Sequence, residues 1–274
     1  MEFNKEVKTK ISLNLSPTSI NTYYQSPLLF YLTYIAKVPD DTKVPVCYGI
    51  SGNIVHDCLE KYANKELDRD GACLHLAKQW IEKNLHNHRD IKNEPLKKED
   101  YLIALINGLN IIDLHDSHVC EELIKFSFAE NELIEIGIKG IVDLQANEKS
   151  SNQSVVIDYK TSNSISQSKD FERQALFYNY LLYKKGKNLP TKTIFHYLKL
   201  GIPKVYSFSQ EDIESFEEEL KAIADKILSN GTDIKNYSIG EINNLFNSKK
   251  QACLNEVTSR FGYSNTRNFI DMRY

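Results

Sequence analysis

The chain has 274 residues, of which 41% are hydrophobic and 26% charged, a balance typical of a folded globular protein and not of a disordered one. It contains no apolar run near the ~18 residues that a membrane helix needs, and its first residues lack the apolar stretch of a secretion signal, so we expect a cytoplasmic protein with no membrane partner. The formal net charge of -3 excludes nucleic-acid binding through whole-molecule charge, so any such site must be a local patch.

Five cysteines are spread along the chain without a C-x-x-C pair. They are Cys47, Cys58, Cys73, Cys120 and Cys253. An odd number at wide spacing fits neither a disulfide framework nor a compact zinc site. We therefore expect reduced cysteines, most of them buried.

The N-terminal part of the chain has the start signals and the spacing of helices. Ser16-Pro17 and Ser26-Pro27 each place a capping residue before a proline, which predicts two short helices. A longer helix is predicted to begin near Gly52. Two more are predicted over about residues 71–86 and 98–115, where apolar residues recur at three-and-four spacing.

Past Cys120 the pattern changes to the alternation that is typical of strands. Residues 123–127 and 133–142 alternate between polar and apolar or bulky side chains. Val155-Val156-Ile157 is a short run of β-branched residues that follows a polar, hairpin-sized loop. This region is predicted to form strands, two of them joined as a hairpin.

A helix is predicted over about residues 169–185, with Gly186 as the residue that ends it. The chain then returns to a strand pattern over residues 193–198. Ser209 and Asp212 form the pattern of a capping box, which predicts one more amphipathic helix. The order of strands, helix and strand predicts an α/β core, and the last 40 or so residues carry no clear pattern.

The candidate chemistry lies at the ends of two predicted strands. Asp143 ends one strand, and Asp158 and Lys160 end the next, so pairing of the two strands brings both acids together. Asp158 and Lys160 are two apart on a strand, so their side chains leave the same face. Two convergent carboxylates with an ammonium can hold a hard divalent cation and position a water against phosphorus. The alternative for an isolated D-x-K tripeptide is an ion pair on a solvated edge.

The wider order of motifs resembles the PD-(D/E)XK nucleases, and within them the RecB-like exonuclease branch that also contains CRISPR-associated iron-sulfur nucleases. Four stretches carry the resemblance in order. They are Leu15 to Tyr31 with two Ser-Pro pairs, Gly49 to Glu60 with a glycine-led histidine, Gly140 to Asp143 with Val156 to Thr161, and Gln174 to Tyr178 with the Q-x-x-x-Y pattern. An ordered set of four is far more specific than any single member.

The resemblance implies roles for individual residues. It makes Asp143 and Asp158 metal-ligating carboxylates, the backbone carbonyl of Tyr159 a further ligand and His56 the residue that completes the metal shell. It makes Lys160 the group that orients or deprotonates the attacking water. The implied cofactor is Mg²⁺ or Mn²⁺.

The resemblance also implies a catalytic role for two residues on one helix. Gln174 and Tyr178 are four residues apart, so both lie on one helix face and can reach the site or a DNA phosphate together. The alternative is a core tyrosine beside a capped glutamine. Glu60, four residues after His56, is either a group that supports the metal ligands or a solvated acid.

The fold that the resemblance implies is a mixed central β-sheet flanked by helices, a restriction-endonuclease-like core with a helical N-terminal region. We expect one domain over residues 1–274. Within it we expect a mainly helical segment over 1–118, the catalytic α/β core over 119–208 and a helical C-terminal segment over 209–274.

The sequence departs from the iron-sulfur members of the branch. Those members carry one cysteine just before the proline of the N-terminal segment and three near the C-terminus, whereas here the first position is Ser26 and only Cys253 is present in the C-terminal region. Four thiolate ligands cannot be assembled, so we expect no iron-sulfur cluster. The tail over residues 241–274 has no assigned role.

Three functions are consistent with these residues. The leading hypothesis is a divalent-metal DNA nuclease, an exonuclease that acts on DNA ends or single strands. The second is a non-catalytic nucleic-acid-binding or adaptor protein that keeps the fold, which the intact Asp143, Asp158 and Lys160 disfavour. The third is a structure-specific endonuclease with the same chemistry.

Overall fold

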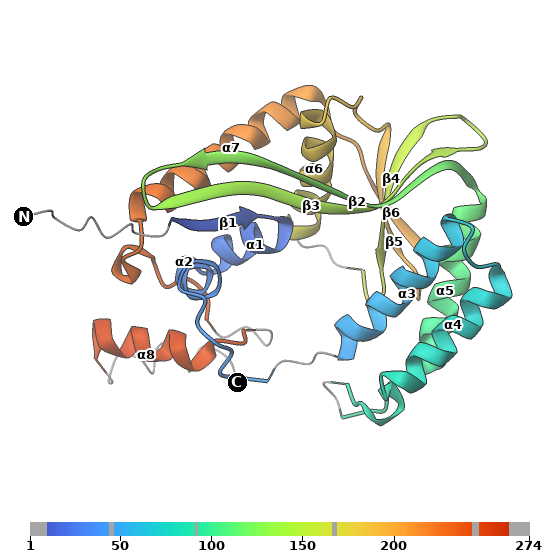
Figure 1. Ribbon diagram of the computed structural model, residues 1–274, viewed down its shortest axis with the longest axis horizontal. Coiled ribbons are helices and arrows are strands. Elements are labelled where there is room, and N and C mark those ends of the chain that lie inside the picture. The colour runs from blue at the N-terminus through green and yellow to red at the C-terminus, as the bar shows by residue number, and fades with distance from the viewer. Residues whose placement is uncertain (1–9, 44–46, 91–92, 166–168, 243–246, 263–274) are drawn as a thin grey trace, which may run out of the picture. The chain divides into compact units, whose positions relative to one another are not determined.

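The computed structural model describes residues 10–43, 47–90, 93–165, 169–242 and 247–262. Within this part of the chain, strands form one six-stranded sheet in the order β1-β3-β4-β5-β6, with β2 paired to β3 (Figure 1). The strands are β1 (Ile11–Leu15), β2 (His115–Glu130), β3 (Ile134–Glu148), β4 (Ser154–Lys160), β5 (Lys192–Tyr197) and β6 (Ile202–Tyr206). The sheet is mixed, because β1 pairs with β3 and β4 with β5 in parallel, whereas β3–β4 and β5–β6 are antiparallel. The predicted fold class is confirmed.

The helices are α1 (Pro17–Gln25), α2 (Pro27–Phe30), α3 (Cys47–Ala63), α4 (Arg69–Glu82), α5 (Lys98–Asp113), α6 (Lys169–Lys184), α7 (Gln210–Asn230) and α8 (Lys250–Phe261). Helices α1 to α5 come between β1 and β2, α6 comes between β4 and β5, and α7 and α8 follow β6. Three shorter helical turns follow α2, α4 and α7, at Tyr31–Ile35, Leu85–Asn87 and Ile234–Asn236. The described residues contain no helix long and apolar enough to cross a membrane.

The chain divides into two compact units. The first comprises Met1–Val44, Lys125–Lys139 and Glu217–Tyr274, and the second comprises Pro45–Ile124 and Gly140–Phe216. The chain passes between the units along the long strands β2 and β3. All of the predicted site residues belong to the second unit.

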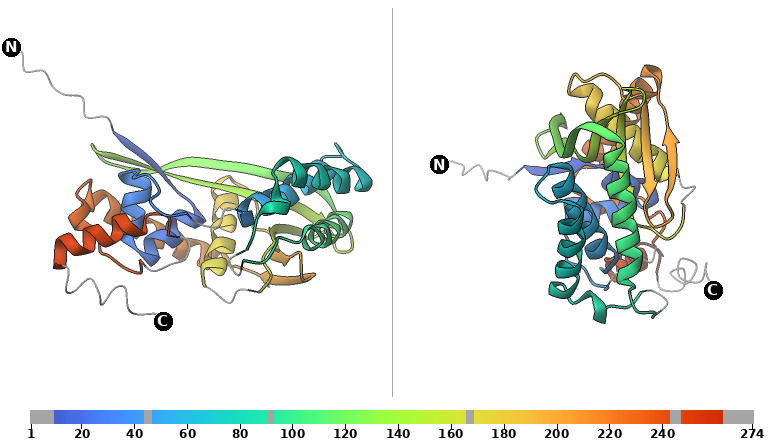
Figure 2. Two further views of the ribbon diagram at one scale, coloured as in Figure 1. Left: turned by 90° about the horizontal axis from the view of Figure 1, so that it is seen from below. Right: turned by 90° about the vertical axis from the view of Figure 1, so that its right-hand side faces the viewer.

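The core of the second unit joins helices α3, α4 and α5 to one face of the sheet. These helices contact one another (Figure 2). Their apolar side chains pack with Leu144, Ala146, Val155, Ile157 and Tyr159 from β3 and β4. Side chains alternate along a strand, so Asp158 and Lys160 leave β4 on the opposite face. Helix α6 covers that face and contacts β5 (Figure 1). Strand β4 is therefore held between two helical layers.

The first unit has its own apolar cluster. Leu28, Leu29 and Leu32 pack with Ile239, Ile242, Cys253 and Val257. Two acids join the N-terminal segment to α8, because Asp40 pairs with the ammonium of Lys249 at 2.5 Å and Asp41 accepts the backbone N–H groups of Gln251 and Ala252 at 3.1 and 2.6 Å. The carboxylate of Asp41 thus satisfies donors at the start of α8 that have no partner inside the helix.

Several local predictions are confirmed. The side chains of Ser16 and Ser26 cap α1 and α2, and Ser209 and Asp212 exchange hydrogen bonds before α7. Gly186 follows α6 with a φ of 78°, in the left-handed region that favours glycine at a helix end.

Other features differ from the prediction. Strands β1 and β6 and helix α8 were not predicted, α3 begins at Cys47 instead of near Gly52, and β2 begins at His115, well before the expected start. The short strands carry too few residues for a pattern, and the apolar residues of β1 become buried only through pairing with β3.

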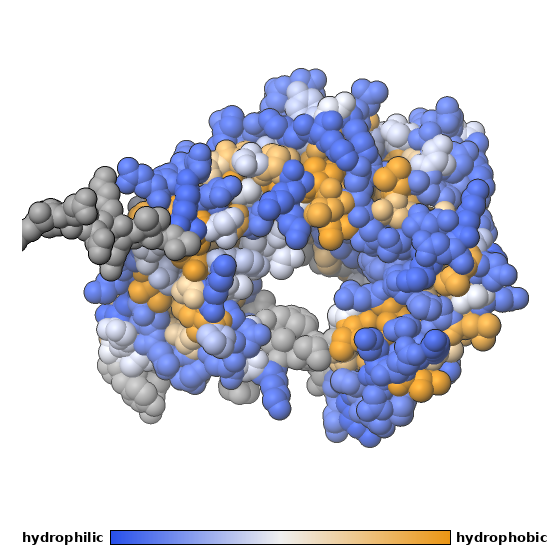
Figure 3. Space-filling model, viewed as in Figure 1, coloured by the Kyte–Doolittle hydropathy of each residue, from blue (hydrophilic) through white to orange (hydrophobic). Residues whose placement is uncertain are grey.

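The surface is mixed. On the face drawn in Figure 3, hydrophilic side chains cover most of the surface and apolar ones reach it in patches. The most exposed large apolar side chains are Leu74 and Ile81 on α4, at 72% and 70%.

Candidate functional site

Two acids lie beside the point where the β3–β4 ladder stops. The prediction that Asp143 ends its strand is wrong, because β3 continues to Glu148, whereas Asp158 does lie near the end of β4. The last pair of the ladder is Leu144 with Ile157, and Asp143 and Asp158 are the residues next to that pair. In addition, the carboxylate of Asp143 accepts a hydrogen bond from the backbone N–H of Tyr159 at 2.9 Å. The side chain of Asp143 therefore takes the place of a backbone acceptor where the ladder ends.

Helix α3 carries His56 to the same place. Its Nε2 lies 2.9 Å from the backbone carbonyl oxygen of Tyr159, and its Nδ1 lies 3.4 Å from Oδ2 of Asp143. One turn earlier on α3, a Cβ added to Gly52 would meet Oγ1 of Thr161 at 3.0 Å. A side chain at Gly52 would crowd this hydroxyl, so glycine lets α3 approach Thr161, the residue that follows β4.

Glu121 is a site residue that the sequence did not single out. Its Oε1 lies 3.9 Å from Nδ1 of His56, and ligand atoms of His56, Glu121 and Asp143 all lie within 4.8 Å of one another. Glu121 has a φ of 47° inside β2, a left-handed conformation that is rare for a residue other than glycine. Such a local kink re-aims a side chain but leaves no trace in the hydrophobic pattern. No sequence signal could have identified this residue.

The charges of these groups perturb one another. Burial and the charge of Asp158 raise the pKa of Asp143 to about 7, despite the opposing charge of His56. Burial lowers the pKa of His56, but the nearby carboxylates, Asp143 first among them, outweigh burial and raise the pKa to about 9. Without a cation, a proton shared among these groups partly offsets the concentrated negative charge.

Lys160 lies on the other side of Asp158. Its ammonium is 2.7 Å from Oδ2 of Asp158 and donates to Oε1 of Gln174 at 2.9 Å. The amide of Gln174 and the hydroxyl of Tyr178 both donate to Oδ1 of Asp158, at 3.2 and 2.8 Å. Burial and the charge of Asp158 raise the pKa of Tyr178 well above its usual value, so its hydroxyl keeps the proton that it donates. Helix α6 thereby fixes Asp158 and Lys160 relative to each other.

Two aromatic rings face the same ammonium. The Nζ of Lys160 lies 4.8 Å from the ring centroid of Phe171 and 4.5 Å from that of Phe195. A cation within about 6 Å of an aromatic face is attracted by the ring quadrupole. The lysine side chain is therefore held by a carboxylate, an amide and two rings.

The residues present fit a divalent cation. Hard cations take carboxylate and carbonyl oxygens, and an imidazole nitrogen is compatible with Mn²⁺. His56, Asp143 and Glu121 offer three ligand atoms that lie close together, and the carbonyl of Tyr159 lies beside the imidazole. Asp158 is near enough for its charge to raise the pKa of both His56 and Asp143. This donor set suits Mg²⁺ or Mn²⁺ and lacks the thiolates that a soft metal would select.

The structure brings the predicted residues of the site together. Their contacts form two sets that meet where Asp158 and Tyr159 are neighbours in β4. One set comprises His56, Asp143 and Tyr159, and the other comprises Asp158, Lys160, Gln174 and Tyr178. Their catalytic or ligand roles remain predictions. Ser26 and Cys253 lie in the first unit, where both are buried. Ser26 caps α2 and also donates to the carbonyl of Ile239, and Cys253 packs in the apolar cluster.

Comparisons with known proteins identify the family of the chain. The family profile described as the PD-(D/E)XK nuclease superfamily matches residues 14–239. A solved structure of a candidate exonuclease from Eubacterium rectale has 10% sequence identity and a TM-score of 0.42, covering 87% of this chain and 90% of that one. The structure of the protein SSO0001 has 16% identity and a TM-score of 0.31, covering 64% of this chain and 86% of that one. No protein of curated function matches the chain. Because the profile spans most of the chain, from β1 to the segment before α8, the protein belongs to the PD-(D/E)XK nuclease superfamily.

Proposed function

We propose that the protein is a divalent-metal-dependent deoxyribonuclease that hydrolyses phosphodiester bonds, most readily at DNA ends or in single strands. The observation that carries the proposal is that Asp143, Asp158 and Lys160 lie on two paired strands beside the last pair of their ladder, with His56 and the carbonyl of Tyr159 next to Asp143. Membership of the nuclease superfamily supports the reaction class. The preference for DNA ends rests on the resemblance to the exonuclease branch.

The carboxylates and His56 have the task of holding the cation. Asp143, Asp158 and the carbonyl of Tyr159 present oxygens, and His56 presents Nδ1 toward Asp143 and Nε2 toward that carbonyl. When bound, a divalent cation supplies Lewis-acid charge that offsets the negative charge developing on the phosphate. Glu121 adds a carboxylate near Nδ1 of His56, where it can orient the imidazole or serve as a ligand itself.

Lys160 has a different task. Its ammonium is a fixed positive group close to Asp158, on the side covered by α6. From there it can orient the attacking water by a hydrogen bond and attract the charge that develops on the phosphate oxygens. Because the group is held before the substrate arrives, little reorganisation is needed during the reaction.

Gln174 and Tyr178 act as positioning residues in this proposal. Their hydrogen bonds end on Asp158 and Lys160, so both act through those two groups. The glutamine amide contacts all three partners, because its oxygen accepts from Lys160 while its nitrogen donates to Asp158 and Tyr178. Loss of Gln174 would free the lysine and the aspartate together.

The test is cleavage of end-labelled linear single-stranded DNA, linear duplex DNA and closed circular DNA in Mg²⁺ or Mn²⁺. We expect linear substrates to be shortened progressively and circular DNA to resist. A chelator should abolish the shortening. Early internal cuts in circular DNA would identify an endonuclease instead. Tight DNA binding without cleavage of any substrate in either metal would contradict the proposal and identify a binding protein.

A further inference from the structure

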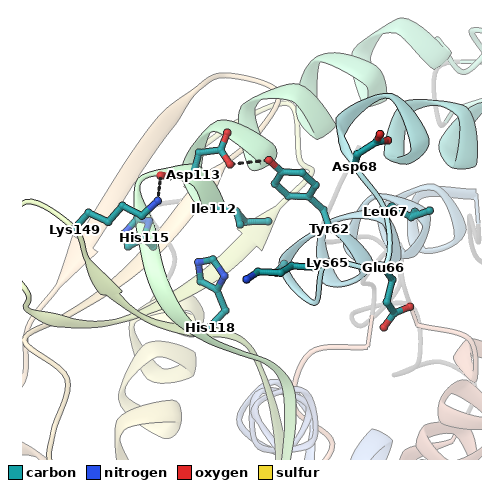
Figure 4. Close-up of a pocket in the computed structure, with 11 residues that line it drawn as sticks. Tyr62, Lys65, Glu66, Leu67, Asp68, Ile112, Asp113, His115, His118 and Lys149 are labelled. Atoms are coloured by element: carbon teal, nitrogen blue, oxygen red, sulfur yellow. Dashed lines mark hydrogen bonds between the residues drawn. The ribbon is translucent and has the colours of Figure 1, made fainter.

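A cavity of about 660 Å³ opens in the second unit, away from the residues described above. It lies where α3 and α5 end and where α4 and β2 begin (Figure 4). One part of its lining is apolar, formed by the ring of Tyr62 together with Leu67 and Ile112. Nitrogen-bearing side chains form another part. They are Lys65, His115, His118 and Lys149. The volume falls within the range of small-ligand pockets.

The acids of the lining are engaged elsewhere. Asp113 accepts hydrogen bonds from the hydroxyl of Tyr62 at 2.7 Å and from the guanidinium of Arg69 at 2.5 Å. Asp68 caps α4 by accepting from the backbone N–H of Gly71 at 2.7 Å. The carboxylate of Glu66 points away from the histidine and lysine side chains (Figure 4). Little negative charge is therefore directed into the cavity.

Two nitrogens of the lining have no protein acceptor. Nε2 of His118 is buried and makes no hydrogen bond in the described part of the chain. The described residues provide no hydrogen bond or ion pair for the ammonium of Lys65 either, and its side chain points toward His118 (Figure 4). His115 and Lys149, by contrast, bind backbone carbonyls at the end of α5. An anion beside Lys65 and His118 would accept hydrogen bonds from both nitrogens.

Both of these residues depend on unusual backbone. Lys65 has a φ of 62° just after α3. Its N–H donates to the carbonyl of Tyr62, and the next N–H donates to the carbonyl of Lys61. These two bonds are typical of a helix end at which the left-handed residue is usually glycine. Ser117, directly before His118, has a φ of 54° inside β2. A lysine in the left-handed conformation of Lys65 costs stability relative to glycine, which points to a use for its side chain.

We propose that this cavity binds one nucleotide of a polynucleotide, with its phosphate beside Lys65 and His118 and its base against Tyr62. The proposal rests on the proposed nuclease function, because the same elements carry both sites. Tyr62 follows His56 on α3 by six residues, about 9 Å, and His118 precedes Glu121 on β2 by three, about 10 Å. The cavity and the candidate site therefore lie along the same helix and the same strand.

The test measures binding of a fluorescent oligothymidylate in Ca²⁺ at several salt concentrations. The variant is Lys65→Gly, which removes the ammonium and relieves the backbone. Its matched control is Lys37→Gly, because Lys37 is an exposed lysine outside the cavity with a φ of 50°. Both variants should unfold at a Tm raised by about 2 °C. Only Lys65→Gly should weaken binding, about fivefold or more, and lower the salt slope by about 0.7, the share of one phosphate contact to a single strand.

His118→Ala keeps the test independent of Lys65, and we expect a similar loss of affinity. Thymidine 5′-monophosphate distinguishes a bound strand from a free nucleotide. If it competes in the wild-type protein and loses affinity in Lys65→Gly, the cavity accepts the nucleotide alone. If it does not compete while oligothymidylate shows the Lys65 dependence, the cavity serves the strand. Either result supports the proposal.

Equal affinity and equal salt slope for Lys65→Gly, His118→Ala and Lys37→Gly would overturn the proposal. Hydrolysis of bis(p-nitrophenyl) phosphate by the wild-type protein in Mn²⁺ reports on the proposed function separately. Absence of that hydrolysis together with Lys65-dependent binding would contradict the nuclease and leave the nucleotide site standing. Normal hydrolysis with Lys65-independent binding would support the nuclease and contradict the nucleotide site.

Discussion

Glu121 and Glu122 are neighbours in β2, yet their carboxylates meet different partners. Glu121 faces His56, with 3.9 Å between Oε1 and Nδ1. Glu122 pairs with the ammonium groups of Lys185 and Lys187 and accepts from the amide of Gln145. Glu121 has a left-handed backbone conformation and directs its carboxylate to the site. Glu122, the next residue, anchors β2 to the residues that follow α6.

Glu121→Gln should weaken metal binding. The change keeps the shape of the side chain and removes the charge beside His56 and Asp143, and groups that support metal ligands typically contribute roughly 10- to 100-fold in metal affinity. Titration of Mn²⁺ followed by electron paramagnetic resonance measures the effect without relying on cleavage. Glu132→Gln, at an exposed position, is the control. Equal Mn²⁺ affinity in both variants would remove Glu121 from the site.

Glu122→Gln should lower stability in a pH-dependent way. Burial raises the pKa of Glu122, but hydrogen bonds from Gln145, Lys185 and Lys187 outweigh burial and lower it to about 2. A folded pKa below the unfolded value of about 4.3 gives stability that is complete above that value and is lost as the pH falls toward 2. Because water screens these half-exposed lysines, the contribution at neutral pH is on the order of 1 kcal/mol.

Urea unfolding at several pH values measures this contribution. The wild-type protein and Glu122→Gln should differ most at neutral pH, and their stabilities should converge as the pH falls below about 4. A difference that stays constant down to pH values near 2 would mean that the charge of Glu122 is not the cause.

Phe171→Leu should slow cleavage and leave metal affinity intact. The ring of Phe171 is one of two that face the ammonium of Lys160, and a partly buried contact of this kind contributes about 1 kcal/mol, or roughly fivefold in rate. Phe171→Tyr keeps an aromatic face and should retain the wild-type rate. Equal rates for the leucine and tyrosine variants would show that the ring only fills space.

The purified protein should contain no stoichiometric iron. Ser26 stands where the iron-sulfur relatives are expected to carry a thiolate, and it is engaged as the cap of α2. Cys253 packs in an apolar cluster, and burial raises the pKa of its thiol, which disfavours the thiolate that binds iron. Iron analysis after anaerobic purification is the measurement. One cluster per chain would refute this expectation.

The sequence predicts the fold and much of the site because each relevant signal is local. Ser-Pro pairs, apolar spacing and the end of β4 follow from adjacent residues, so α1, α2, α5 and the pairing of β3 with β4 could be predicted. Glu121 could not, because its place depends on a φ of 47° that the surrounding structure imposes. The contacts of Lys160 with Phe171 and Phe195 also escape prediction, since the rings come from α6 and β5 and meet the lysine only in the folded chain.

The central claim is that the acids hold a cation and Lys160 acts on the substrate. In Mg²⁺, the most direct measurement is the cleavage rate of linear single-stranded DNA together with metal and DNA affinity for Asp143→Asn, Asp158→Asn and Lys160→Ala. We expect the two aspartate variants to lose metal affinity and cleavage together, with partial recovery at raised metal concentration. We expect Lys160→Ala to bind metal and DNA nearly as the wild-type protein does while cleavage falls by roughly two or more orders of magnitude. Cleavage by Lys160→Ala at the wild-type rate would contradict the account and place the chemistry elsewhere.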